Sequence, residues 1–182
     1  MRNKKSSKRR SVRLKDFDYS SPNDYYITIC SYNRECVFGN IIDGEMILND
    51  LGRIVEREIL NTQKIRKNVF IEIFQTMPNR VHLIITILGN NDVDRRGTLQ
   101  RAPTKERFGK PTSNSIPTIV RLIKSTTTKQ INVLRNTPEK HVWQRGYYEH
   151  IIRNEKSYDE IYFYILSNPA VWNEDRNNPK NA

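Results

Sequence analysis

The sequence predicts an α+β domain built on an antiparallel β-sheet. Strand-like segments alternate with segments of helical periodicity, and only a short Pro-Asn break separates two of the strand-like segments. The chain of 182 residues is also long enough to bury a core. The predicted order is strand, helix, strand, strand, helix, strand, helix. In that order the segments span residues 25–31, 49–65, 69–77, 81–88, 115–135, 142–153 and 157–172.

The predicted strands are rich in aromatic and β-branched residues, as strands prefer. The first, 25–31, reads YYITICS and follows a turn at Pro-Asn-Asp. Pro78 and Asn79 interrupt an apolar stretch, so the segments on either side should form an antiparallel hairpin. The fourth strand, 142–153, contains Tyr147, Tyr148, Ile151 and Ile152.

The predicted helices repeat apolar residues at three- and four-residue spacing. The helix 49–65 can be capped by Asn49 or Asp50, and the helix 115–135 has the same periodicity. In the last helix, 157–172, we expect Ser157 to cap the start with Glu160 as its capping-box partner. Helices placed between hairpin-linked strands favour a ferredoxin-like sheet with its helices packed on one face.

The chain length favours one domain, predicted to span residues 16–175. Residues 1–15 are dominated by Lys, Arg and Ser and are predicted to be a basic flexible tail, and residues 176–182 a short second tail. Residues 89–114 are polar and almost free of large apolar side chains, which predicts a disordered insertion.

The composition favours a nucleic-acid partner. The net charge is +11 and the pI is about 9.8, which predicts attraction to polyanions, with a membrane surface as the competing interpretation. The sequence contains no run of about 18 apolar residues, so it predicts no membrane span. The basic N-terminal segment lacks the apolar region of a signal peptide. We therefore expect a cytoplasmic protein. Cys30 and Cys36 match neither a disulfide framework nor a zinc pattern.

Two short stretches carry candidate chemistry. Side chains alternate across a strand, so Arg80 and His82 should share the face opposite Val81 and its apolar neighbours. Tyr164 and Asn168 are four residues apart and should share one face of the last helix. A surface histidine and an ordinary amphipathic helix ending before a proline explain the same residues, and both interpretations stay open.

A third stretch interleaves aromatic residues with arginines. Residues 143–153 read WQRGYYEHIIR, a pattern that suits base stacking beside phosphate contacts. An ordinary strand with one solvated face has the same pattern. Both interpretations remain.

In order along the chain, these segments resemble the REP-associated tyrosine transposases, a branch of the HUH single-strand nuclease superfamily. The matching stretches are VRLKDFDY (12–19), YITIC (26–30), MPNRVHLI (77–84), IKS (123–125), WQRGYYEHIIR (143–153) and YILSNPAVW (164–172). The stretches are spread along the sequence, so the resemblance covers nearly the whole chain. The resemblance implies a ferredoxin-like fold and an enzyme that nicks and rejoins single-stranded DNA near hairpins.

The resemblance also implies roles for individual residues. Tyr164 would be the nucleophile that forms a 5′-phosphotyrosine, and His82 and Asn168 would be ligands of Mg²⁺ or Mn²⁺. Arg80 stands where the family has its first metal-binding histidine, and arginine cannot ligate a cation. Three alternatives follow: catalysis is lost and DNA binding kept, Arg80 contacts the phosphate in place of the ion, or Arg80 is a change within an active lineage.

The expected partner is single-stranded or hairpin DNA, bound by a monomer or a homodimer. The predicted DNA contacts are Arg80, Arg121, Lys124, Arg145 and Arg153, together with the basic tail. A catalytically inactive, domesticated DNA-binding protein is the main alternative to a transposase. An RNA-binding ferredoxin-like module is the second alternative, which the aromatic strand residues only weakly favour.

Overall fold

The computed structural model describes residues 17–89 and 114–181, and its centre is a four-stranded antiparallel sheet. The strands are β1 (Asn23–Cys30), β4 (Val69–Met77), β5 (Arg80–Ile87) and β6 (Tyr148–Ile152). They lie side by side in the order β4-β5-β1-β6, and every neighbouring pair is antiparallel. This order is that of a ferredoxin-like sheet, so the predicted fold class is confirmed.

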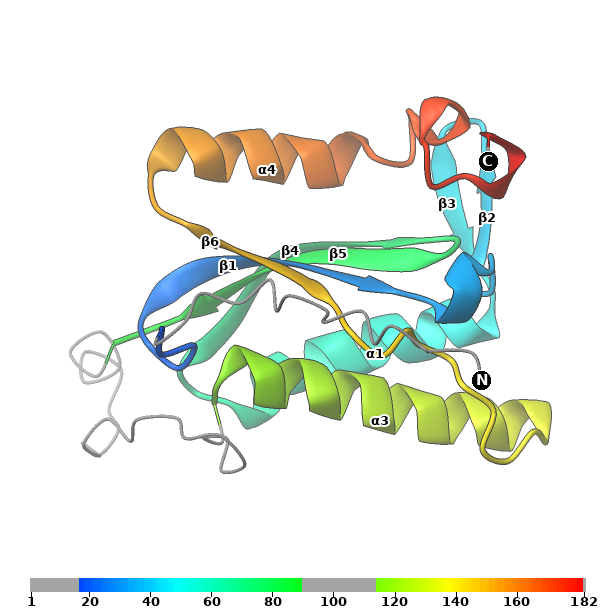
Figure 1. Cartoon of the computed structure of the whole chain (residues 1–182), viewed down its shortest axis with the longest axis horizontal. Coiled ribbons are helices and arrows are strands. Elements are labelled where there is room, and N and C mark those ends of the chain that lie inside the picture. Colours follow the sequence, from blue (N-terminus) through cyan, green and yellow to red (C-terminus); the bar gives the residue numbers. More distant parts are fainter. Residues whose placement is uncertain (1–16, 90–113, 182) are drawn as a thin grey trace, which may run out of the picture.

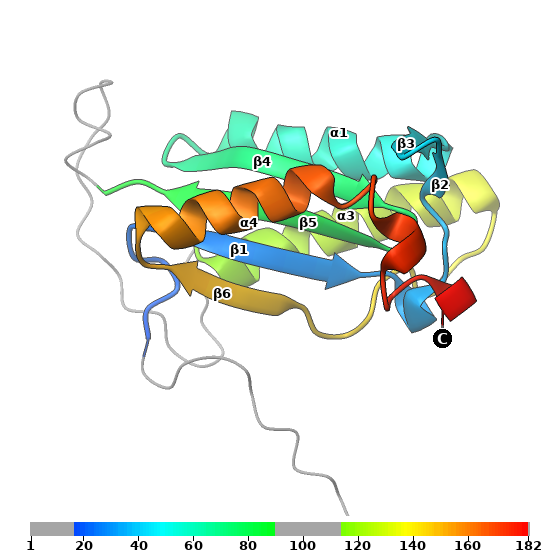
Figure 2. The same ribbon diagram turned by 90° about the horizontal axis from the view of Figure 1, so that it is seen from above.

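Helices lie on both faces of the sheet (Figures 1 and 2). Helices α1 (Asp50–Ile65) and α3 (Ile116–Arg135) pack on one face and against each other. Helix α4 (Glu155–Ser167) crosses the opposite face, over β4 and β5. The sequence predicted helices on one face and a separate C-terminal helix carrying the tyrosine. The structure adds that this last helix covers part of the second face.

Strand alternation divides the core into two clusters. The larger cluster lies between the sheet and the pair α1 and α3, and it contains Val81, Leu83 and Ile85 of β5, as predicted. The smaller cluster lies under α4, where Ile84 of β5 packs with Ile165. The predicted apolar face of β5 is therefore confirmed, and the opposite face is also buried.

A small hairpin was missed from the sequence, which predicted a loop there. Strands β2 (Gly39–Ile42) and β3 (Glu45–Leu48) pair antiparallel and precede α1. The two residues between them, Asp43 and Gly44, have φ of 50° and 78°. An Asp-Gly pair with positive φ is a signal for a two-residue hairpin turn, so the sequence did contain the information.

Two boundaries near the C-terminus differ from the predictions. Asn154, and not Ser157, caps α4, because the Asn154 side chain accepts a hydrogen bond from the backbone N–H of Ser157. The predicted capping box is therefore wrong. The strand predicted at 142–153 begins only at Tyr148, because the earlier part forms a single bridge at Trp143, whose indole N–H donates to Thr127.

The remaining elements are short turns and the segment that follows α4. Short 3-10 turns lie at Tyr32–Arg34, Trp172–Glu174 and Pro179–Asn181. The segment predicted as a tail from residue 176 packs on the domain through residue 181: Asn177 accepts from Asn79, and Asn178 is buried. The predicted basic tail at 1–15 and most of the predicted insertion at 89–114 lie outside the described residues. Within 17–89 and 114–181, no helix is long and apolar enough to cross a membrane.

Gly52 tests how tightly the hairpin packs on α1. A Cβ at this position would lie 2.2 Å from the carbonyl oxygen of Phe38 and 2.7 Å from a methyl of Leu48. Alanine normally stabilises a helix relative to glycine by about 1 kcal/mol. Here we expect Gly52→Ala to lower the free energy of unfolding by about 1–3 kcal/mol instead, because the backbone must shift.

Chemical denaturation measures this change, with Gly146→Ala as the matched control. A Cβ at Gly146 would meet no atom within 4 Å. That control should stay within about 0.5 kcal/mol of the native protein. A Gly52→Ala protein as stable as the native one would contradict the close approach of the hairpin to α1.

Candidate functional site

The candidate site lies between the sheet and α4. Arg80 and His82 point to this side because they alternate with the core residues of β5. Tyr164 and Asn168 reach the same place from the C-terminal end of α4, one helical turn apart. Asp175 joins them from the segment that follows α4.

The guanidinium group of Arg80 is the centre of the site and is only 2% exposed. Its Nε–H donates to His82 Nε2 at 2.7 Å, and Nη1 donates to Asn79 Oδ1 at 3.1 Å. Its Nη2 donates to Asn168 Oδ1 at 2.9 Å and also to the carboxylate of Asp175, with which Arg80 forms an ion pair. The two side chains predicted as metal ligands, His82 and Asn168, thus both accept hydrogen bonds from Arg80.

These contacts fix the state of His82. Since Nε2 accepts from Arg80, the ring proton lies on Nδ1, which is 2.8 Å from the hydroxyl of Tyr26 and 2.9 Å from that of Thr28. Burial, and then the charge of Arg80, lower the pKa of His82 from 6.5 to about 3, against the opposing charge of Asp175. His82 is therefore neutral near neutral pH.

Asp175 balances the charge of Arg80. Burial alone would raise the pKa of this carboxyl group, but the backbone N–H of Asn177 and the charge of Arg80 hold the pKa below its usual value. The ring of Trp172 lies 5.3 Å from the Arg80 guanidinium carbon and adds a cation–π contact. Arg80 and Asp175 therefore form an ion pair inside the site.

Among Arg80, His82, Tyr164 and Asn168, Tyr164 is the most exposed, at 46%. Its ring meets the rings of His82 and Tyr26 edge-on, with centroids 5.5 Å and 6.3 Å away. The side-chain amide of Asn168 donates to the backbone carbonyl of Tyr164 at 2.6 Å and so links the end of α4 to the Arg80 network. Burial raises the pKa of Tyr26, which keeps this phenol protonated.

The arrangement provides a fixed positive charge and a solvent-accessible phenol. The guanidinium group is held by four acceptors, and its charge is balanced within the protein. The side chain of Tyr164 is partly exposed beside this network, and its ring packs on His82. Chemistry at this surface would therefore act on a ligand that lies over α4 and the adjoining sheet.

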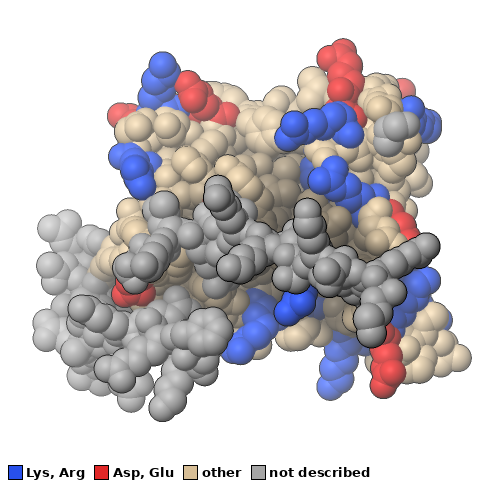
Figure 3. All heavy atoms as spheres, viewed as in Figure 1, with Lys and Arg blue, Asp and Glu red and all other residues tan. Residues whose placement is uncertain are grey.

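The structure brings together four of the predicted site residues and places the others elsewhere. Arg80, His82, Tyr164 and Asn168 meet under α4. Arg121, Lys124 and Arg145 line a groove beside α3, on the other side of the sheet. Lys and Arg side chains, blue in Figure 3, project along the lower part of that view, where α3 lies in Figure 1.

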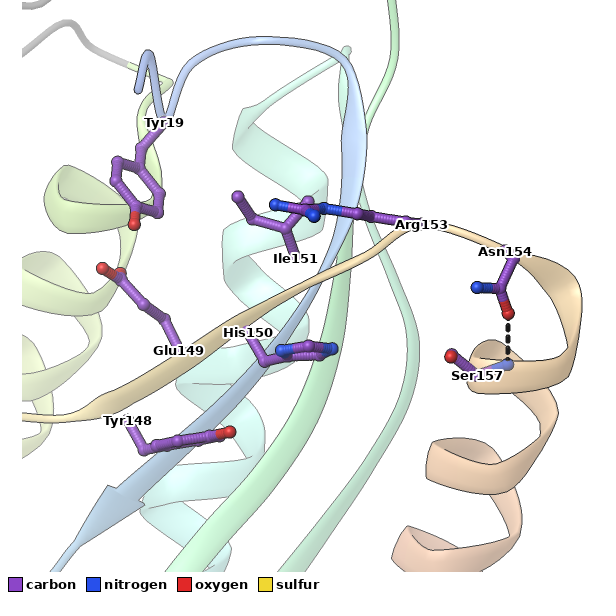
Figure 4. A pocket seen from close by; sticks show the side chains of 8 residues that line it. All are labelled: Tyr19, Tyr148, Glu149, His150, Ile151, Arg153, Asn154 and Ser157. Atoms are coloured by element: carbon purple, nitrogen blue, oxygen red, sulfur yellow. Dashed lines mark hydrogen bonds between the residues drawn. The ribbon is translucent and has the colours of Figure 1, made fainter. Parts of the chain in front are cut away.

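Arg153 lies at a third place, a hollow along β6 that is lined by Tyr148, His150 and Ser157 among others. Figure 4 shows Tyr148 and His150 extending from β6 toward the side of α4, whereas Glu149 extends toward Tyr19. Tyr148 is 48% exposed, and its ring packs edge-on against Tyr26, 5.9 Å away. An aromatic surface therefore runs from β6 to Tyr164.

Five residues of the site were not identified from the sequence: Tyr26, Thr28, Asn79, Trp172 and Asp175. Tyr26 and Thr28 could have been found, because they alternate along β1 on the same face. Only the strand register places Thr28 opposite His82, with Tyr26 two residues away along β1. Trp172 and Asp175 follow α4 in a segment without regular periodicity. Nothing in the sequence pattern indicated that Asp175 would pair with Arg80.

Comparisons with known proteins agree with this architecture. No family model matches the chain. A protein of Haemophilus influenzae, described as uncharacterized, is 44% identical over 168 residues, which span 92% of each chain. This chain belongs to the same family as that protein. Among solved structures, a REP-associated tyrosine transposase bound to a REP hairpin matches with a TM-score of 0.56 at 18% identity, over 88% of this chain and 72% of that one.

The match to the transposase shows a shared fold. It confirms the architecture that the resemblance implied, an antiparallel sheet with a tyrosine-bearing C-terminal helix. The roles of Tyr164, His82 and Asn168 remain predictions, because a likeness at 18% identity does not carry activity from one chain to another.

The neutral state of His82 makes stability depend on pH. The unfolded chain takes up a proton on this ring as pH falls below 6.5, whereas the folded protein does so only near 3. The free energy of unfolding should therefore fall as pH decreases from 6.5 toward 3, by up to about 1.4 kcal/mol per pH unit. Denaturant titrations at several pH values measure this slope.

The variant His82→Gln should have a flatter profile in that window, because it lacks the titrating group. His150 is exposed, so His150→Gln serves as the matched control and should keep the native slope. A native slope in His82→Gln would show that another group causes the loss of stability.

Proposed function

We propose that this protein binds hairpin or single-stranded DNA through a transposase-like fold, without a divalent metal ion and without cleaving the strand. The observation that carries the proposal is the Arg80 guanidinium, which is hydrogen-bonded to both predicted metal ligands and paired with Asp175. The net charge of +11 supports a polyanionic partner. The similar transposase structure was solved with a REP hairpin.

The side chains present do not fit Mg²⁺ or Mn²⁺ while Arg80 occupies its position. A metal ion would need the lone pairs of His82 Nε2 and Asn168 Oδ1, and both accept hydrogen bonds from Arg80 at 2.9 Å or less. A divalent ion beside this buried cation would also be repelled strongly. In the part of the chain that the structure describes, no group of three His, Cys, Asp or Glu side chains could replace these ligands.

The same geometry argues against a metal-free nuclease in which Arg80 polarises the phosphate. Arg80 is 2% exposed and its charge is balanced by Asp175, so a phosphate would have to displace an existing ion pair to reach it. A phenol attacks a phosphate slowly unless a base or a strongly polarised target activates it. Tyr164 is therefore proposed to contact DNA through its exposed ring, and not to attack it.

Binding and cleavage can be separated with one labelled hairpin carrying single-stranded flanks. We expect the same affinity in EDTA and in Mn²⁺, a steep decrease of affinity with salt, and no covalent protein–DNA adduct. Tyr164→Phe should bind like the native protein, because it keeps the ring. Gel-shift titration and denaturing electrophoresis of the same samples give both results.

An adduct that forms with the native protein and disappears in Tyr164→Phe would establish a tyrosine nuclease and overturn the proposal. Stronger binding to RNA than to DNA of equal sequence would favour the alternative RNA-binding module. A salt-independent affinity would remove nucleic acid as the main partner.

The role of Arg80 is tested by restoring a ligand. Arg80→His removes the guanidinium and adds an imidazole beside His82, so Mn²⁺ should raise its thermal stability and allow nicking of the hairpin. Arg80→Gln loses the same charge without adding an imidazole, and it should show neither effect. Because the two variants leave Asp175 equally unpaired, their difference in Mn²⁺ isolates the metal.

An Arg80→His protein that folds but gains neither metal stabilisation nor nicking would show that the missing histidine is not what prevents catalysis. Circular dichroism of both variants establishes that they are folded.

A further inference from the structure

A basic groove lies on the side of the sheet opposite to Tyr164. It runs between α3 and the segment 141–147 and has a volume of about 660 Å³. Four of its cationic residues are Arg121, Lys124, Lys129 and Arg145, and no Asp or Glu is among the described residues that line it. Arg121, Lys129 and Arg145 are exposed and form no ion pair with another described residue.

Lys124 has a different position from the other three cations. Its Nζ donates to the backbone carbonyl of Gln144, and lies 3.3 Å and 3.2 Å from the carbonyls of Arg145 and Gly146. Burial lowers the pKa of Lys124. Its donors are thus used within the protein, where they fix the loop that carries Arg145 at the edge of the groove.

The exposed groups have the spacing that a nucleic-acid backbone requires. Arg121 and Lys129 are eight residues apart on α3, which corresponds to about 12 Å along the helix. Ser125 and Thr128 lie between them on the groove side, where their hydroxyls donate to backbone carbonyls of α3. Each strand of a duplex carries one phosphate for about every 3.4 Å of the helix axis, so a row of this length can meet more than one phosphate.

The groove also leads toward Tyr164. Arg145 precedes Tyr148 by three residues, and β6 is an edge strand of the sheet. Tyr148 faces the α4 side, where its ring packs on Tyr26, and Tyr26 in turn packs on Tyr164. A strand that leaves the groove and crosses the β6 edge therefore meets exposed aromatic rings on which bases can stack.

We propose that the groove beside α3 is a second DNA site that holds the sugar–phosphate backbone of a duplex stem, while the single-stranded flank passes over β6 to Tyr164. In this arrangement Arg121, Lys129 and Arg145 contact phosphates, and Lys124 is a positioning residue. The inference rests on the proposed DNA-binding function and assigns the stem and the flank to different faces of the sheet.

The experiment compares two double variants of the full chain that lose equal charge. Arg121→Gln with Arg145→Gln changes the groove, whereas Arg53→Gln with Lys64→Gln changes exposed positions of α1. Fluorescence anisotropy measures the affinity for a DNA stem-loop with a flank, and for the flank alone, at several salt concentrations. The groove variant should weaken stem-loop binding and reduce the log–log salt slope by about 2, with flank binding unchanged.

The α1 variant should keep the native slope. A groove variant that binds the stem-loop like the α1 variant would overturn the groove proposal while leaving DNA binding intact. A native protein that binds neither DNA would overturn the proposed function as well. Tighter binding of an RNA stem-loop of equal sequence would reject DNA as the occupant of the groove.

Single variants separate contact from positioning. Arg121→Gln should reduce the salt slope by about 1, since it removes one phosphate contact. Lys124→Gln should weaken stem-loop binding but leave the slope unchanged, because the lysine orders the loop and contacts no phosphate. A slope reduced by about 1 in Lys124→Gln would show that Lys124 contacts DNA directly.

Discussion

The burial of the Arg80 guanidinium is the constraint on which the arrangement around the site depends. A charge that is 2% exposed is costly unless its donors and its charge are both satisfied, and loss of a buried partner costs about 3–5 kcal/mol. The required acceptors come from three places: His82 on β5, Asn168 on α4, and Asp175 in the segment beyond α4. Arg80 thereby holds the tyrosine-bearing helix and the C-terminal segment on the sheet.

The acceptors around Arg80 are of a kind that a divalent ion could also use. A guanidinium and a divalent ion both need electron-pair donors arranged around a positive centre, so an imidazole nitrogen and an amide oxygen suit either one. The guanidinium brings its own N–H groups and its own planar geometry, and Asp175 supplies the balancing charge. In this structure both acceptors are bonded to Arg80, and through Asn168 they hold the end of α4 that carries Tyr164 on the sheet.

The division of charge between the two faces of the sheet follows from the topology. Helix α3 and the segment before β6 place unpaired cations on one side, whereas α4 covers a paired cation and leaves aromatic rings exposed on the other. Phosphates and bases attract different side chains, so in the proposed complex the cationic face suits the backbone of the DNA and the aromatic face suits its bases. The narrow edge strand β6 joins the two surfaces.

The sequence by itself determined the four strands of the main sheet, the main helices and the alternation along β5, but not the β2–β3 hairpin. Hydrophobic periodicity is local, so it places Arg80 and His82 opposite Val81 without any knowledge of their neighbours. The sequence also paired Tyr164 with Asn168, four residues apart on one helix. Only the tertiary structure decided that Asp175 neutralises Arg80, that Tyr26 and Thr28 face His82, and that Lys124 is engaged by carbonyls. Those contacts join residues that are far apart in the chain. They depend on the strand register and on how the helices dock on the sheet, and no local sequence pattern encodes either one.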